Sequence, residues 1–323
     1  MTLLRDRRSR LLAALIAMGL IAGVTGGTYA AFNSATSNAS NTFGVKADYE
    51  APTVVRSEIA RTTATAGGRI RANVAYYVYA QITDGGNPAS GVNTATANVC
   101  AITTATCASV ALASGSYTVS GLSYNYRSGS KTSDAGLTAG SKTYSVTTTD
   151  VAGNASGAVN FSVVVDATAP GGSNVQTANA SGGTAGLPQT SDTVTFTFNE
   201  AMDPASIKAL WTGTSTLVTV NLANAGCAGS DALSVTGGVN LGTVCLIGNY
   251  VNGSRNFTNS TMVLSPSGTV ITITLGTPSA AFNTETVAGT MTWTPSAAAL
   301  DVAGNACTTT VVTEVTPPAD VEF

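Results

Sequence analysis

Hydrophobic and polar residues alternate over a long segment in the first third of the chain. One face of this segment carries Ile70, Ala72, Val74, Tyr76, Val78, Ala80 and Ile82, and the other carries mostly polar residues and tyrosines. A period of two is typical of a β-strand with one buried face. The pattern therefore predicts a strand over 70–82. Shorter segments between Gly, Ser and Asn turns predict further strands at 96–102, 109–113, 116–119, 123–126, 143–149 and 158–165.

The second half of the chain shows the same kind of pattern with one exception. Strands are predicted at 193–198, 215–222, 232–235, 243–247, 269–275, 290–294 and 308–314, and 227–260 is predicted to contain an additional hairpin. The exception follows the first of these strands, where Asp203 precedes Pro204. Aspartate is a good N-cap and proline is favoured at the first helical position, so a single helical turn is expected, ending near Trp211.

An internal repeat divides the chain. The pentapeptide Asp-Val-Ala-Gly-Asn occurs at 150–154 and again at 301–305, and an acidic segment ending in proline occurs at 48–52 and at 166–170. Each unit thus begins with the acidic linker and closes near the pentapeptide, which predicts two tandem domains at 48–166 and 167–316 and an unpaired tail at 317–323. The pentapeptide itself is expected to form a tight turn, because Gly and Asn tolerate positive φ and aspartate caps such turns.

The strand count and two motifs resemble known domains. About seven short strands in the first unit are typical of an immunoglobulin-like sandwich. Leu137, Gly140 and Tyr144 have the spacing of a tyrosine corner, in which the phenol is expected to tie its strand to the preceding crossover. This unit resembles bacterial immunoglobulin-like domains of cell-surface proteins. In the second unit, residues 198–207 are similar to the Phe-x-Glu-x-Met-Asp-Pro-x-Ser/Thr-Ile motif of the immunoglobulin-like domain of S-layer proteins. The expected fold class is all-β, with two tandem immunoglobulin-like β-sandwich domains after an N-terminal signal helix.

The N-terminal segment has the form of a signal peptide. Four arginines in the first ten residues precede the uncharged stretch 11–24, which as a helix would span about 21 Å, less than the roughly 30 Å hydrocarbon core. Cleavage after Ala30 or Ala31 would remove 1–31 and leave Phe32 at the start of a flexible segment, 32–47. An uncleaved leader that anchors the chain in the membrane is the alternative, and it is the only membrane contact expected.

Residues 26–33 and 41–43 resemble the leader and mature start of camelysin-like surface proteins and biofilm matrix fibre proteins that are cut by the SipW-type signal peptidase. The resemblance covers about forty residues. It implies export, cleavage at the step Ala30–Ala31–Phe32 and, in some members, fibres formed by strand exchange.

Composition narrows the function classes. The chain of 323 residues contains no histidine and only 10% charged residues. A Ser-His-Asp or Cys-His couple and a His-ligated zinc are therefore excluded, and no catalytic residue is singled out. After residue 31 there are 10 basic and 16 acidic residues. An acidic body offers no basic stripe for phosphates, so nucleic-acid binding is not expected.

The five cysteines fit an exported protein, in which disulfides are the rule. A bridge between Cys100 and Cys107 would close a hairpin, and one between Cys227 and Cys245 would do the same in the second unit. Cys307 is then left over. Three pairings are possible within the second unit, so a free Cys227 or Cys245 remains an alternative.

Acidic residues recur at equivalent places in both units. In a sandwich of this topology the linker acid, the acid after the second strand and the pentapeptide aspartate should meet at one end. The residues concerned are Asp166, Glu200 or Asp203, Asp301 and Asn305 in the second unit, and Asp48 or Glu50, Asp84, Asp150 and Asn154 in the first. Such oxygen ligands suit Ca²⁺. The alternative is that each aspartate caps its own turn; no other cofactor is expected.

These features predict a non-enzymatic secreted or cell-surface protein with a structural or adhesive role, whose partners are other surface or matrix proteins or further copies in a matrix or fibre. A glycan- or surface-binding module is the second hypothesis, with Tyr77, Tyr79, Tyr124, Tyr126 and Trp211 as candidate contacts, although such tyrosines also form cross-strand pairs. A hydrolase that uses carboxylates alone, with Glu200 as the test residue, is the third.

Overall fold

The computed structural model describes residues 48–315 and 321–323 and is almost entirely β. The predicted leader at 1–31 with its cleavage residues Ala30, Ala31 and Phe32 lies outside this range, as do the predicted flexible segment 32–47 and residues 316–320. Among the described residues no helix is both long and apolar enough to cross a membrane. The strands pair into two separate sheets, one of nine strands and one of ten. An all-β fold is thus confirmed.

The first sheet follows the order β1-β3-β6-β5-β4-β8-β9-β2, with β7 beside β3. The pairs are antiparallel except for β2 and β9, which run parallel. The first and last parts of the path pack against each other, because β1 contacts both β8 and β9. The strands are β1 (Thr53–Arg61), β2 (Arg69–Ile70), β3 (Ala75–Thr83), β4 (Val92–Asn98), β5 (Val110–Val119), β6 (Leu122–Ser128), β7 (Lys131–Thr132), β8 (Gly140–Asp150) and β9 (Val159–Val165).

The core of the first sheet lies between its two layers. It is built from the inward-facing apolar residues of the alternating strands, with Ile59, Ile70, Tyr76, Val78 and Val146 fully buried. Alternation places every second side chain of a strand on one face, so this core follows from the sequence pattern. The Tyr144 hydroxyl is 3.1 Å from the Ser57 hydroxyl on β1. The predicted tie from Tyr144 to the preceding crossover is therefore wrong: the phenol bonds across the core to β1.

The long predicted strand over 70–82 is interrupted. β2 ends at Ile70 and β3 begins at Ala75, and between them Asn73 has φ of 52°. A positive φ turns the backbone away from the extended conformation, so pairing cannot continue through this residue. Ser133 bonds to both ends of the break, because its hydroxyl donates to the Arg71 carbonyl and accepts from the Val74 amide. The apolar period continues through the break because Val74 still packs against the core.

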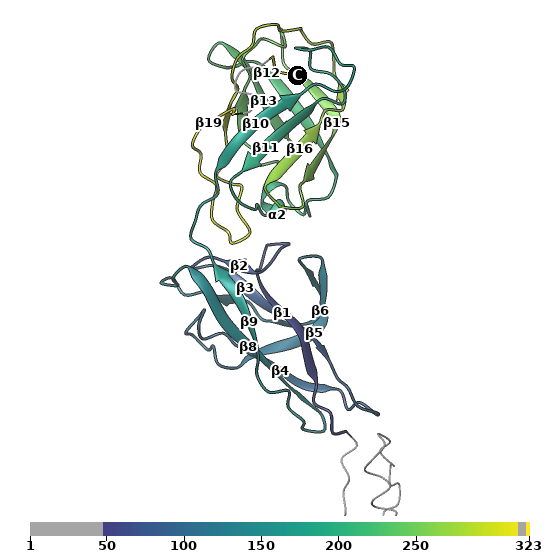
Figure 1. Ribbon diagram of the computed structural model, residues 1–323, viewed down its shortest axis with the longest axis vertical. Coiled ribbons are helices and arrows are strands. Elements are labelled where there is room, and N and C mark those ends of the chain that lie inside the picture. The colour runs from purple at the N-terminus through teal and green to yellow at the C-terminus, as the bar shows by residue number, and fades with distance from the viewer. Residues whose placement is uncertain (1–47, 316–320) are drawn as a thin grey trace, which may run out of the picture. The chain divides into compact units, whose positions relative to one another are not determined.

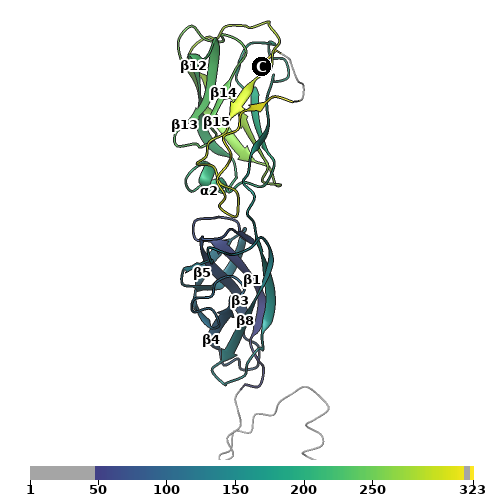
Figure 2. The same cartoon turned by 90° about the vertical axis from the view of Figure 1, so that its left-hand side faces the viewer.

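The second sheet follows the order β10-β11-β16-β15-β12-β13-β14-β18-β19, with β17 beside β15. β10 also contacts β18 and β19 at the other end of the path. Figures 1 and 2 show the short helix α2 (Pro204–Ile207) and the C-terminus at opposite ends of this sheet. The strands are β10 (Gly172–Ala178), β11 (Thr193–Phe198), β12 (Thr216–Cys227), β13 (Ser230–Thr236), β14 (Thr243–Cys245), β15 (Arg255–Leu264), β16 (Val270–Thr274), β17 (Thr277–Pro278), β18 (Thr292–Thr294) and β19 (Val312–Thr313).

Trp293 on β18 is the centre of the second core. Its indole packs edge-on against Phe196 and Phe198 of β11, with ring centroids 5.1 and 5.0 Å apart, and its Nε1 donates to the Leu241 carbonyl at 2.6 Å. A buried indole is stable only when its N–H has such a partner. The predicted helical turn is confirmed but shorter than expected, because α2 ends at Ile207; Asp203 caps it by accepting from the Ala205 amide.

The end of the chain differs from the predicted unpaired tail. Phe323 is 2% exposed and packs edge-on against Tyr250, with ring centroids 5.6 Å apart. Its amide donates to the Thr177 hydroxyl on β10, and its carbonyl accepts from the Gly186 amide at 2.7 Å. The apolar ring and two backbone bonds hold residues 321–323 in the second core, which the proline-rich sequence before them does not indicate.

Both predicted disulfides are present. Cys100 is bonded to Cys107, and Cys227 at the end of β12 is bonded to Cys245 on β14. The second bridge lies in the predicted additional hairpin, in which β13 pairs with β14. Cys307 is free and buried, and burial raises the pKa of its thiol to about 11. Two disulfides are consistent with an oxidising, extracellular environment.

Candidate functional site

The repeated pentapeptide forms the same turn in both sheets. In each copy the aspartate amide donates to the asparagine carbonyl, at 3.0 Å for Asp150 and 3.1 Å for Asp301. The aspartate Oδ1 accepts from the asparagine amide at 2.7 Å, and its Oδ2 accepts from the asparagine side chain at 2.7 and 2.8 Å. The glycine has positive φ, 86° at Gly153 and 98° at Gly304. The predicted turn chemistry is confirmed: each aspartate caps its own turn.

The asparagine of each turn also bonds to the acidic linker that begins the unit. Asn305 Nδ2 donates to the Asp166 carbonyl at 3.2 Å, and Asn154 Nδ2 donates to the Glu50 carbonyl at 3.4 Å. The turn is therefore hydrogen-bonded to the backbone of the linker in both sheets. The linker and the pentapeptide, which recur together in the sequence, are thus bonded to each other in both copies.

Three acids meet beside the second turn. The side chains of Asp166, Glu200 and Asp301 each offer a carboxylate oxygen within 4.8 Å of the other two. They line a cavity of about 70 Å³ together with Arg69, Ala201 and Val302. This volume holds a small cation with one or two water molecules but no larger ligand. The predicted meeting of linker acid, post-strand acid and pentapeptide aspartate thus occurs, and Glu200 rather than Asp203 completes it.

Glu200 is the least satisfied member of this group. Its Oε1 is inaccessible to solvent and has no hydrogen-bond partner among the described residues. Burial raises the pKa of its carboxyl, the charges of Asp301 and Asp166 raise it further, and Arg69 lowers it. Arg69 neutralises only part of the negative charge, because its guanidinium pairs with Asp166 at 2.9 Å and is half exposed. The group can therefore accept a cation or a proton.

Asp203, the alternative to Glu200 in the prediction, has another role. It forms a buried ion pair with Arg61 at the end of β1, with side chains 3% and 4% exposed. Burial raises the pKa of the Asp203 carboxyl and Arg61 lowers it. Arg61 also donates from Nε to the Val302 carbonyl at 3.0 Å. A residue of the first sheet thus bonds to both the helix cap and the pentapeptide turn of the second.

A second arginine of the first sheet contacts the same turn. Arg71 Nε donates to the Gly304 carbonyl at 2.9 Å. Together with Arg61 and Arg69 it forms the arginine clamp, the name used below for these three residues. The sequence pattern did not single out these residues. The available signal was their density, since three of the six arginines after residue 31 fall between 61 and 71 in an otherwise acidic body.

The first sheet contains part of the equivalent acidic group. Asp84 and Asp150 offer carboxylate oxygens within 4.8 Å of each other. Asp84 Oδ2 accepts from the Gly91 amide, whereas its buried Oδ1 has no hydrogen-bond partner among the described residues. Glu50 contributes its carbonyl to Asn154. Asp48 belongs to a separate unit that ends at Tyr49, so it is not assigned to this pair.

The aromatic residues predicted as exposed contacts are mostly buried. Tyr79, Tyr124 and Trp211 are 8%, 3% and 4% exposed, and Trp211 Nε1 donates to the Thr214 carbonyl. Tyr77 and Tyr126 are partly buried, and Arg127 lies over the ring of Tyr77 at 4.2 Å. Tyr79 packs edge-on against Tyr77 and Tyr117. The expectation of exposed aromatic contacts is therefore wrong for Tyr79, Tyr124 and Trp211. Tyr79 instead packs across strands against Tyr117 and Tyr124.

Comparison with known proteins adds no relative: no family model, no curated protein and no solved structure matches the chain.

Proposed function

We propose that this chain is a non-enzymatic secreted or cell-surface protein in which two immunoglobulin-like domains act as a stiff spacer or matrix module. The observation that carries the proposal is the arginine clamp. A flexible pair of domains needs only a covalent linker, whereas here a buried ion pair and backbone-directed guanidinium groups join the two sheets. Domains within one chain move relative to each other by default, and these bonds would oppose such motion.

Two further observations support the structural role over an enzyme. The acids that meet beside the second turn enclose about 70 Å³, well below the roughly 300 Å³ of a small-molecule site, so a sugar ring has no room between them. The chain also lacks histidine. The carboxylate-only hydrolase is therefore the less supported hypothesis, and Glu200→Gln tests it, because loss of any turnover in that variant would favour it.

We also propose that Asp166, Glu200 and Asp301 bind Ca²⁺ and thereby stiffen the same junction. The support is the unpartnered Glu200 Oε1 and an excess of negative charge that Arg69 does not cancel. The alternative role, in which Asp301 caps its own turn, is already present, since both of its carboxylate oxygens accept hydrogen bonds from Asn305. Calcium could be coordinated by Asp301 Oδ2 without breaking the turn, because this oxygen accepts one hydrogen bond of the turn and has a second acceptor direction.

The decisive experiment isolates the exported protein, determines its N-terminus and images it by negative-stain microscopy with and without calcium. A start at Phe32 with filaments supports the matrix or fibre role. A start at Phe32 with single particles supports a secreted spacer, and a retained leader supports a membrane-tethered stalk. Recovery of the protein only from the cytoplasm would overturn the proposal.

A further inference from the structure

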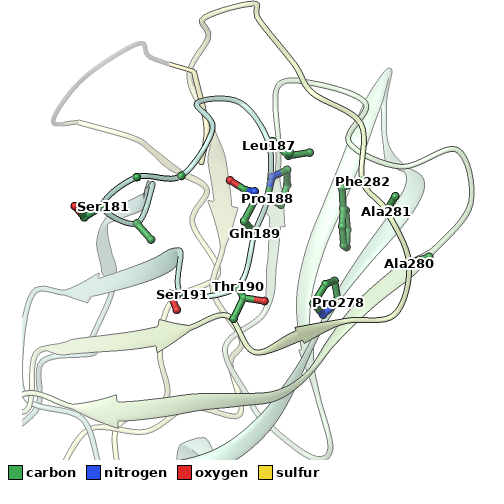
Figure 3. A pocket seen from close by; sticks show the side chains of 13 residues that line it. Ser181, Leu187, Pro188, Gln189, Thr190, Ser191, Pro278, Ala280, Ala281 and Phe282 are labelled. Atoms are coloured by element: carbon green, nitrogen blue, oxygen red, sulfur yellow. The ribbon is translucent and has the colours of Figure 1, made fainter.

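The second sheet contains a pocket distant in sequence from the arginine clamp. Figure 3 shows its two walls: the loop that carries Leu187, Pro188, Gln189 and Thr190, and the segment that carries Pro278 and Phe282. The pocket has a volume of about 530 Å³. Sites for small organic ligands are typically 300–1,000 Å³, so this pocket, unlike the acidic cavity, has room for an organic molecule.

The first wall is held in place by a buried aspartate. Asp192 is fully buried, and its two carboxylate oxygens accept from the amides of Ala180 and Gln189, at 2.9 and 2.6 Å. These bonds join both ends of the loop. The Thr190 hydroxyl donates to the Gly276 carbonyl at 2.8 Å, which ties the loop to the opposite wall. Hydrogen bonds to a charged acceptor are among the stronger ones, so the loop is ordered without a ligand.

The second wall presents a fixed aromatic ring. Phe282 stacks on the fully buried Phe257, with centroids 4.6 Å apart and ring planes 9° from parallel. The same wall is anchored by Ser279, whose amide donates to the Asn256 carbonyl and whose hydroxyl accepts from the Asn256 amide. Phe282 remains partly exposed and lines the pocket. A site with both walls ordered in advance loses little conformational entropy on binding.

The chemistry of the lining selects a neutral, hydroxylated ligand. None of the described residues that line the pocket has an ionisable side chain; the polar groups are serine and threonine hydroxyls, the Gln189 amide and glycine backbone. The apolar groups are the Phe282 ring, two prolines, Leu187 and alanines. A pyranose ring combines an apolar face of C–H groups with a rim of hydroxyls. The apolar face matches the wall that carries Phe282, and the hydroxyls match the opposite wall of neutral hydrogen-bonding groups.

We propose that this pocket binds a neutral saccharide, with the sugar ring against Phe282 and its hydroxyls bonded to the loop around Gln189. The Gln189 Oε1 accepts from the Thr184 amide at 2.7 Å, which fixes the orientation of the side chain and makes Nε2 the donor. The saccharide would give the chain a specific attachment point, and this function does not depend on whether the two domains act as a spacer.

The test uses the purified full chain and a panel of neutral oligosaccharides of glucose, galactose, mannose and N-acetylglucosamine, with binding measured by titration calorimetry. Two variants address the two walls. Phe282→Ala removes the aromatic surface. Gln189→Ala removes the amide donor, together with the acceptor for the Thr184 amide, while leaving its backbone bond to Asp192. Val287→Ala is the matched control, because Val287 lies in the same segment, is 65% exposed and does not line the pocket.

The expected result is millimolar or tighter binding of at least one oligosaccharide, weakened about tenfold or more by each pocket variant and unchanged in Val287→Ala. Circular dichroism shows whether Phe282→Ala is folded; if it is not, Gln189→Ala alone decides. The proposal is overturned if no oligosaccharide binds, if Gln189→Ala binds as the natural chain does, or if only an unglycosylated peptide or a charged saccharide binds.

Discussion

The ion pair between Arg61 and Asp203 gives the sharpest test of the junction. Replacing Arg61 by Met keeps the aliphatic length of the side chain but leaves the Asp203 carboxylate buried without its partner. Both side chains are at most 4% exposed, so solvent does not screen the pair. Removing one member of a buried pair typically costs about 3–5 kcal/mol. Arg61 also loses its bond to the Val302 carbonyl, so we expect a loss in this range.

The loss should depend on pH in a defined direction. Burial holds the pKa of Asp203 above its ordinary value, so protonation of this carboxyl favours the folded state. This stabilisation is fully present below the ordinary pKa and is lost as pH rises through the folded pKa. Without Arg61 the pKa rises further. The difference between the natural chain and Arg61→Met should therefore be largest near pH 7 and shrink towards about pH 4, where the buried carboxyl becomes neutral.

Urea unfolding followed by tryptophan fluorescence measures this difference. Both tryptophans, Trp211 and Trp293, are buried in the second sheet, which contains Asp203. Adding Asp203→Asn to Arg61→Met should recover much of the loss, because asparagine keeps the cap on α2 and no buried charge remains. Lys142→Met is the control for removing a cation from an exposed hydrogen bond. An Arg61→Met midpoint equal to that of Lys142→Met, or a penalty that is the same at pH 4 and pH 7, refutes the reasoning.

Three further predictions follow from other sites. In thermal melts, 1 mM Ca²⁺ should stabilise the chain by about 1.4 kcal/mol for a dissociation constant near 0.1 mM. Glu200→Gln should abolish this stabilisation, and the stabilisation should fade as pH falls through the raised pKa of Glu200. A melting temperature that does not shift with up to 10 mM Ca²⁺ would contradict a calcium site. The double variant Cys227→Ser, Cys245→Ser should lower the free energy of unfolding by about 3 kcal/mol, and the same change at Cys100 and Cys107 by about 2 kcal/mol, because the bridges span 18 and 7 residues. Equal losses in urea unfolding would count against loop-closure entropy as the cause. Cys307 should resist alkylation at pH 8 until the chain unfolds, since its thiol is buried with a pKa near 11, and rapid labelling of the native chain would argue against this placement.

The sequence predicted the strands where alternation is regular and missed those where it is broken. β11 was predicted with its observed bounds. β1 was not predicted, because a register shift between Val54 and Arg56 places an extra residue in the strand and breaks the period of two. The segment 70–82 shows the reverse error, since the apolar period continues while Asn73 interrupts the pairing. Periodicity records burial and carries no information on backbone continuity.

The candidate site shows the same division. The meeting of Asp166, Glu200 and Asp301 could be predicted because strand topology brings loop ends together whatever their side chains do. The arginine clamp could not, because Arg61, Arg69 and Arg71 reach partners more than 90 residues away and nothing local specifies them. The choice between Glu200 and Asp203 likewise depended on Arg61, whose pairing with Asp203 removes that carboxylate from the acidic group.

The clamp makes the order of the two sheets along the chain matter. Arg61 ends β1 and Arg71 follows β2 of the first sheet, whereas the carbonyls they bond belong to the pentapeptide turn of the second; Arg69 pairs with Asp166, directly after β9. If the two sheets were exchanged along the chain, we expect every strand pair and both pentapeptide turns to be kept, whereas the Arg61 and Arg71 guanidinium groups would face no turn. We therefore expect that grafting residues 61–71 onto another sandwich placed before the second sheet would transfer these bonds as well.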